Sequence, residues 1–111
     1  MIGLMLSIEC FDLGYLKRIG NKYAFVSNAS EIKNAKQSYP FDMKLFKLCD
    51  SGAMSFDNIP YPFSEYLSCC DRPDIKDKAG IVDTDDEFEK LYKIAGLEIE
   101  RVHFTIKQYN N

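Results

Sequence analysis

The sequence has no tryptophan, a single histidine, no long apolar run and no excess of positive charge. Its 14 basic residues are outnumbered by 17 acidic ones, which gives a net charge of −3. Binding to a nucleic-acid backbone needs a broad positive field, so we expect no direct nucleic-acid binding. A glycine-rich phosphate loop is also missing, because the following glycines are isolated from one another: Gly14, Gly20, Gly52, Gly80 and Gly96.

The N-terminal residues lack the features of a signal peptide or a membrane span. No basic region precedes the apolar stretch, which stops at Ser7 and is followed by Glu9. The stretch is too short to cross a bilayer, so we expect a cytoplasmic protein that begins with a strand. A chain of 111 residues can form one domain with a real core but not two, and residues 1–111 are interpreted as a single domain.

Candidate catalytic and metal-binding residues are few, and each has a simpler structural role. His103 is predicted on a strand face with charged and polar neighbours, where a solvated histidine is commoner than a general base. Asp83, Asp85 and Asp86 precede an apolar helical stripe, where helix capping explains them better than a metal does. The cysteines lack zinc-ligand spacing and a secretion signal, so we expect reduced thiols at Cys10, Cys49, Cys69 and Cys70. We therefore expect no cofactor, no metal and no enzymatic activity.

The first part of the chain has the alternating pattern of β-strands. Residues 4–11 place apolar side chains at every second position, which predicts a strand with one buried face. Two further runs, 13–19 and 22–27, flank Gly20 and Asn21, and both of these residues tolerate positive φ. The sequence therefore predicts a hairpin here.

The next part is less regular. Residues 28–38 are polar, with one helical turn predicted at 30–33. After Pro40, residues 41–48 are predicted to form another strand, and 49–58 a loop because of their turn-forming composition.

The second half of the chain carries helix signals. Pro62 suits the first turn of a helix. Apolar residues follow at the i, i+3, i+4, i+7 spacing of a buried helical face: Phe63, Tyr66, Leu67 and Cys70. A second short helix is predicted from Pro73 to Gly80.

A third helix is predicted after a capping box at Thr84 to Glu87. Its predicted buried stripe is Phe88, Leu91, Tyr92 and Ala95, and Gly96 is its predicted C-terminal cap. A last strand follows over 97–106, with a change of phase near Glu100. Strands, then helices, then a closing strand predict an α+β fold, with a small, mainly antiparallel sheet and two to three helices packed on one side.

One segment, 55–67, is unusually rich in aromatic residues and proline. Aromatic side chains held by a stiff loop suit a protein interface, because little entropy is lost when they bind. The alternative is that these side chains fill the core. For Phe56, Ile59 and Tyr61 a core position is as plausible as an interface, and for Phe63 it is favoured. We predict the partner-binding residues Phe56, Ile59, Tyr61, Phe63 and Tyr66.

Several segments, taken in order, carry a family resemblance. They are the strand pair Gly14-Tyr15-Leu16 and Tyr23-Ala24-Phe25-Val26, the aliphatic segment 40–46, the proline/aromatic segment 61–67 and the helix 88–96. This order resembles the N-terminal subdomain of HipA-type serine/threonine kinases, the toxins of bacterial toxin–antitoxin systems. The resemblance spans nearly the whole chain and implies a HipA N-terminal-subdomain-like fold. One departure is Leu67-Ser68-Cys69-Cys70, where the family often has Leu-Leu-Pro-Glu.

The kinase core of that family, with its phosphate loop and catalytic aspartate, is absent from the sequence. A lobe of this kind encoded on its own is similar to HipS, the small component of tripartite HipBST systems, in which the kinase HipT lacks the lobe. The resemblance implies an antitoxin that inhibits a HipT-like kinase by supplying this lobe in trans. It also implies a HipB-like DNA-binding protein as a further member of the complex. The segment 56–63 is then the predicted contact near the kinase active site.

Small size and acidity permit a second hypothesis, a phage- or mobile-element-encoded inhibitor of a host defence protein. If such an inhibitor mimics nucleic acid, it needs long stripes of acidic residues. This sequence has none, and its acidic residues near position 85 are explained by helix capping. A small enzyme or metal-binding protein is the least favoured interpretation.

Overall fold

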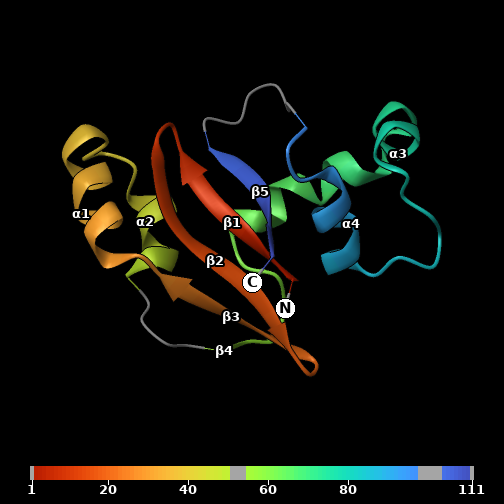
Figure 1. Ribbon diagram of the computed structural model, residues 1–111, viewed down its shortest axis with the longest axis horizontal. Helices are drawn as coiled ribbons and strands as arrows, with labels where there is room; N and C mark the ends of the chain where they lie inside the picture. Colours follow the sequence, from red (N-terminus) through yellow and green to blue (C-terminus); the bar gives the residue numbers. More distant parts are fainter. Residues whose placement is uncertain (1, 51–54, 98–103, 111) are drawn as a thin grey trace.

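Strands at both ends of the chain meet in one sheet. The computed structural model describes residues 2–50, 55–97 and 104–110. Its elements are β1 Ile2–Ile8, β2 Phe11–Ile19, β3 Lys22–Ser27, α1 Ala29–Ser38, α2 Met43–Cys49, β4 Ser55–Phe56, the 3-10 helices η1 Phe63–Tyr66 and η2 Ser68–Asp71, α3 Pro73–Ala79, α4 Glu87–Ile94 and β5 Thr105–Asn110 (Figure 1).

The described strands form a five-stranded antiparallel sheet in the order β4-β3-β2-β1-β5. With the helices around it, this is the α+β fold that the sequence predicts. The predicted hairpin is confirmed as β2 and β3. The predicted first strand over 4–11 is confirmed up to Ile8, where β1 ends; residues 9 and 10 turn, and Phe11 begins β2. The number of helices is larger than the predicted two to three, because residues 28–50 contribute α1 and α2.

A bulge between β1 and β2 depends on Gly14. Leu6 lies opposite Gly14 and Ser7 opposite Asp12, which leaves one extra residue on β2. Gly14 has φ of 149°, and a methyl group at this position would overlap the carbonyl oxygen of Val26 and lie 2.7 Å from Cζ of Phe25. Only glycine fits this backbone conformation and this close approach.

The two faces of the sheet differ. One face carries Leu4, Leu6 and Ile106, which are buried. The same face packs on helices, since the ring of Phe25 lies 6.1 Å from that of Phe63 in η1. In Figure 1 the sheet passes in front of the green segment that contains η1 and η2. The core therefore lies between the sheet and these helices.

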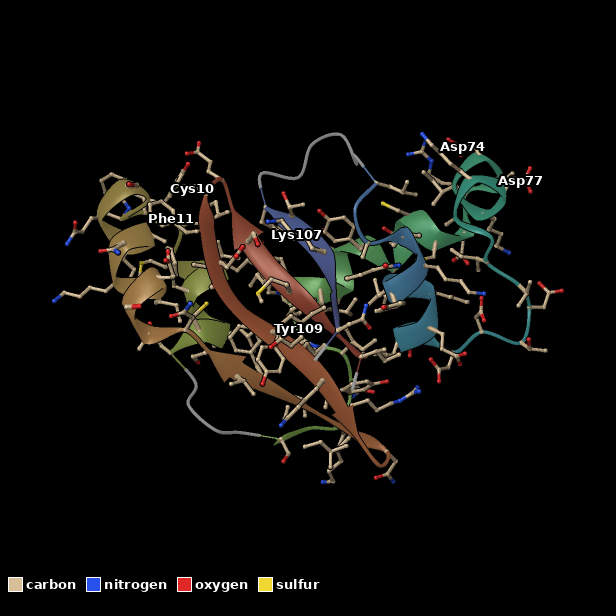
Figure 2. The ribbon with its side chains drawn as sticks, viewed as in Figure 1. Cys10, Phe11, Asp74, Asp77, Lys107 and Tyr109 are labelled. Carbon is tan, nitrogen blue, oxygen red and sulfur yellow. The ribbon has the colours of Figure 1, made fainter. Side chains whose placement is uncertain are left out.

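The other face is open. It carries the half-buried side chains of Met5, Tyr15 and Tyr109 and the exposed Lys107. The rings of Tyr15 and Tyr109 stack with centroids 4.4 Å apart. Figure 2 shows Lys107 and Tyr109 on β5.

The predicted strand over 41–48 is wrong, because residues 43–48 belong to α2 and residues 41 and 42 lie in the turn before it. The side chain of Asp42 caps this helix by accepting a hydrogen bond of 3.3 Å from the amide of Leu45. The buried residues of α2 include the neighbours Leu45 and Phe46, which an alternating strand would place on opposite faces. The predicted single turn at 30–33 is also too short, since α1 has ten residues and buries Ile32.

The helices of the second half differ in detail from their predictions. Residues 63–71 form two short 3-10 helices in place of one α-helix. The helix from Pro73 is confirmed, and it ends at Gly80 with φ of 74°. The capping box lies two residues later than predicted: Asp86 caps α4, with Glu89 as its reciprocal partner.

The closing strand is confirmed in part. β5 buries Ile106, and Phe104 just before it is also buried, as their shared phase predicts. Residues 98–103, which include His103 and the predicted phase change at Glu100, lie outside the described residues.

Candidate partner-binding surface

The acidic residues before α4 were candidate metal ligands in the sequence. Among the described residues, no three His, Cys, Asp or Glu side chains are grouped so that they could hold a metal ion. Asp85 forms an ion pair of 2.6 Å with Lys93, and Asp86 forms one with Arg18. Both carboxylates therefore act within the fold around α4.

The cysteines are free thiols. Cys49 and Cys70 are buried, and burial raises the pKa of Cys49 to about 12 and that of Cys70 to about 11. The thiolate is the nucleophile and the metal ligand, so these two groups are inert near neutral pH. Cys10 lies on the exposed β1–β2 turn, as Figure 2 shows.

Three of the five predicted partner-binding residues are core residues. Ile59, Phe63 and Tyr66 have exposed fractions of 7%, 0% and 4%. The hydroxyl of Tyr66 donates a hydrogen bond of 2.8 Å to the carbonyl oxygen of Phe104. A buried side chain offers no surface to a partner, so the predicted contact surface is corrected to Phe56 and Tyr61.

Phe56 and Tyr61 are both half-buried. Phe56 lies in β4 opposite Tyr23 of β3, at the edge of the sheet. Tyr61 packs edge to face on Phe104 with ring centroids 6.2 Å apart. The ammonium group of Lys44 lies 4.2 Å from the centroid of the same ring. Tyr61 therefore lies between the core and α2.

Its environment changes the acidity of Tyr61. Burial raises the pKa of its phenol, and the negative charges of Asp42 and Glu65 raise it further. The hydroxyl therefore stays protonated at neutral pH and can donate a hydrogen bond to a partner.

The sequence prediction missed two exposed apolar residues at the start of α2. Phe41 and Met43 have exposed fractions of 94% and 79%, and Met43 precedes Lys44 in α2. We call the group Phe41, Met43, Lys44 and Tyr61 the α2 surface. The signal that could have found it is Asp42, whose capping position predicts a helix from residue 43 instead of a strand.

Comparisons with protein-family models, with curated proteins and with solved structures found no significant match. None of the described helices combines the length and the apolar character needed to span a membrane.

Proposed function

We propose that this chain is a cytoplasmic, antitoxin-like protein that binds and inhibits a HipT-like serine/threonine kinase. It acts by supplying, in trans, the N-terminal lobe that such a kinase lacks. The order of segments that resembles the HipA N-terminal subdomain supports this proposal. A HipB-like DNA-binding protein is the further partner that the resemblance implies.

The observation that carries the proposal is the α2 surface. Phe41 and Met43 are more exposed than any other large apolar residue that the structure describes. Tyr61 contacts both Phe104 and Lys44, the residue that follows Met43, so its position is fixed before binding. A lobe detached from its kinase keeps an apolar face for its former neighbour, and that face becomes an interface.

Inhibition needs no catalytic group in this chain. Aromatic side chains that are already ordered lose little entropy when they bind, and they dominate the energetics of many interfaces. Docking of Tyr61 and Phe56 close to the kinase active site would block substrate or hold the kinase in an inactive arrangement.

Mixing the purified chain with a HipT-like kinase tests the proposal. The expected result is co-elution in size-exclusion chromatography and a loss of kinase autophosphorylation. A kinase with its nucleotide-binding lysine replaced serves as a control for binding without activity. Failure to co-elute at micromolar concentration contradicts the proposal.

A further inference from the structure

Helices α1 and α2 border a hollow on the outside of the molecule, with a volume of about 740 Å³. Its lining combines three apolar residues, three lysines and one aspartate: Pro40, Met43, Phe46, Lys36, Lys44, Lys47 and Asp50. Two smaller hollows adjoin it, of about 290 and 390 Å³. The first shares Lys36 and Asp50 with the large hollow, and the second shares Pro40. We call these three neighbouring hollows together the α1–α2 groove; the two helices lie at the left in Figure 1.

The turn between the two helices presents Phe41 beside the groove. The amide of Tyr39 donates to Ala35 and that of Asp42 donates to Tyr39, at 2.9 and 3.2 Å. The carboxylate of Asp42 also caps α2, so the backbone is fixed on both sides of Phe41. Phe41 is nevertheless 94% exposed. An exposed aromatic side chain on an ordered turn, next to an apolar hollow, is typical of a binding surface.

The charges of the groove set the chemistry of its occupant. Lys36 is neutralised by Asp50, since its ammonium group lies 2.7 and 2.8 Å from the two carboxylate oxygens. Lys44 and Lys47 form no ion pair with a carboxylate of residues 2–50, 55–97 or 104–110. They lie at i and i+3 of α2, on one exposed side of the helix. The ammonium group of Lys44 also contacts the ring of Tyr61, which is uncharged, so both lysines keep their positive charge at this edge of a chain of net charge −3.

We propose that the α1–α2 groove binds an acidic amphipathic segment of a partner protein. An apolar side chain of that segment enters the hollow between Met43 and Phe46 and packs against Phe41. Carboxylates about one helical turn apart on the segment reach Lys44 and Lys47. Charge complementarity selects this occupant, because a basic segment would be repelled and a neutral one would leave both lysines without counter-charges. The binding does not depend on the partner being a kinase.

A random peptide library displayed on phage tests this assignment without a known partner. The library is selected on the wild-type chain after depletion on the Lys44→Glu/Lys47→Glu variant. The expected consensus combines one or two large apolar residues with acidic residues three or four positions apart. A consensus without acidic residues, or no enrichment over the depleted pool, overturns the proposal.

Synthetic peptides with the selected sequence then give the contribution of each group. Lys44→Glu/Lys47→Glu and Phe41→Ser/Met43→Ser should each weaken binding by about tenfold or more. Phe41→Ser/Met43→Ser should leave the melting temperature unchanged because both side chains are exposed. Lys44→Glu/Lys47→Glu should lower it slightly, because Lys44 also contacts the ring of Tyr61. Lys76→Glu/Lys78→Glu on α3 changes the net charge equally and should leave affinity unchanged. Equal weakening by this control indicates nonspecific charge attraction and overturns the assignment.

Two other occupants have distinct outcomes. Self-association that Phe41→Ser/Met43→Ser abolishes in analytical ultracentrifugation would identify a second copy of this chain. Binding to phosphatidylserine vesicles that the same variant abolishes, with no peptide enriched, would identify a membrane surface. Either result overturns the proposal. Loss of binding to a HipT-like kinase, with the acidic consensus retained, contradicts the proposed function and leaves the groove assignment standing.

Discussion

The hydroxyl of Tyr66 and the carbonyl oxygen of Phe104 are joined by a hydrogen bond of 2.8 Å, and their rings meet edge to face with centroids 5.8 Å apart. The pair connects η1 to the residue that precedes β5. Tyr66→Phe keeps the ring contact and removes the hydrogen bond, so the free energy of unfolding should fall by about 1 kcal/mol. Urea denaturation followed by circular dichroism measures this loss. An unchanged midpoint would show that the bond does not stabilise the fold.

The same pair predicts a loss of stability at alkaline pH. Burial, with the nearby Cys69 thiol as a smaller cause, raises the pKa of Tyr66 from 10.0 to about 12. The stability that this phenol contributes is fully present below pH 10.0 and is lost as the pH rises towards 12. Ionisation of the buried thiols Cys49 and Cys70 also destabilises the fold at high pH. The informative quantity is therefore the difference in the free energy of unfolding between wild type and Tyr66→Phe. Tyr66→Phe should lose less stability than wild type over this interval in urea titrations.

The capping box of α4 predicts a second stability change. The carboxylate of Asp86 accepts a hydrogen bond of 2.8 Å from the amide of Glu89 and pairs with Arg18. Asp86→Ala should cost about 1 kcal/mol, whereas Asp86→Asn retains a cap and should cost a few tenths, because the ion pair is exposed.

The pH dependence of Asp86 separates charge from capping. Burial alone would raise the pKa of Asp86, but the hydrogen bond from Glu89 and the charge of Arg18 outweigh burial and hold the pKa below 3.8. The contribution of the charge is therefore present above pH 3.8 and is lost as the pH falls through the lower folded value. Asp86→Asn and wild type should converge in stability under these acidic conditions; a constant difference would contradict this origin.

The bulge at Gly14 predicts a large effect from one methyl group. In Gly14→Ala the new side chain would meet the backbone of Val26 and the ring of Phe25 at a φ that alanine rarely adopts. We expect a loss of about 2 kcal/mol or more in the free energy of unfolding. Gly20→Ala is the control, since a methyl group at Gly20 meets no atom within 4 Å and only the strain of positive φ remains. Equal losses in the two variants would rule out the close approach as the cause.

Phe56 and Tyr61 should contribute more to binding a partner than to the stability of the fold. Phe56→Ala/Tyr61→Ala should weaken the complex with a HipT-like kinase by about tenfold or more, because aromatic anchors contribute strongly to interfaces. Both residues are half-buried, so the variant should lose less stability than Ile59→Ala, which opens a cavity and costs about 2–5 kcal/mol. Isothermal titration calorimetry and thermal unfolding measure the two effects. A variant that binds normally would place the interface elsewhere.

The sheet could be predicted from the sequence because only one of its faces is buried. Leu4, Leu6 and Leu16 are buried, while Met5 and Tyr15 between them are partly open, and this contrast produces the period of two. Gly20 and Asn21 then indicate where the chain turns back. Local chemistry therefore suffices for β1, β2 and β3.

The alternation of buried and open side chains did not identify α2, because a short helix can bury adjacent residues. Leu45, Phe46, Leu48 and Cys49 are all buried, since α2 contacts both α1 and β3. These four positions, spaced i, i+1, i+3 and i+4, lie on one helical face, but seven residues make too few turns for the period of 3.6 to stand out in the sequence. The capping residue Asp42 was the better evidence, because its side chain stabilises a helix whatever the helix packs against.

The candidate site was predicted only in part, because burial depends on contacts that are distant in sequence. Tyr66 is buried by Phe104, 38 residues further on, and no local pattern reveals this pair. Conversely, Phe41 belonged to the predicted strand, where it would have been half covered. Its exposure follows from its position in the turn between two helices, which the strand prediction excluded.

The pairing of β1 with β5 determines when the sheet can be completed during synthesis. Gly3 lies opposite Tyr109, roughly one hundred residues later. A ribosome that adds about 5–20 residues per second needs about 5–20 s to span this interval. Once Ser27 has been added, β1, β2 and β3 can pair, but the outer edge of β1 has no neighbour until β5 follows. The nascent chain therefore passes through a stage with an open strand edge, the stage at which chaperones and early partners have most to protect.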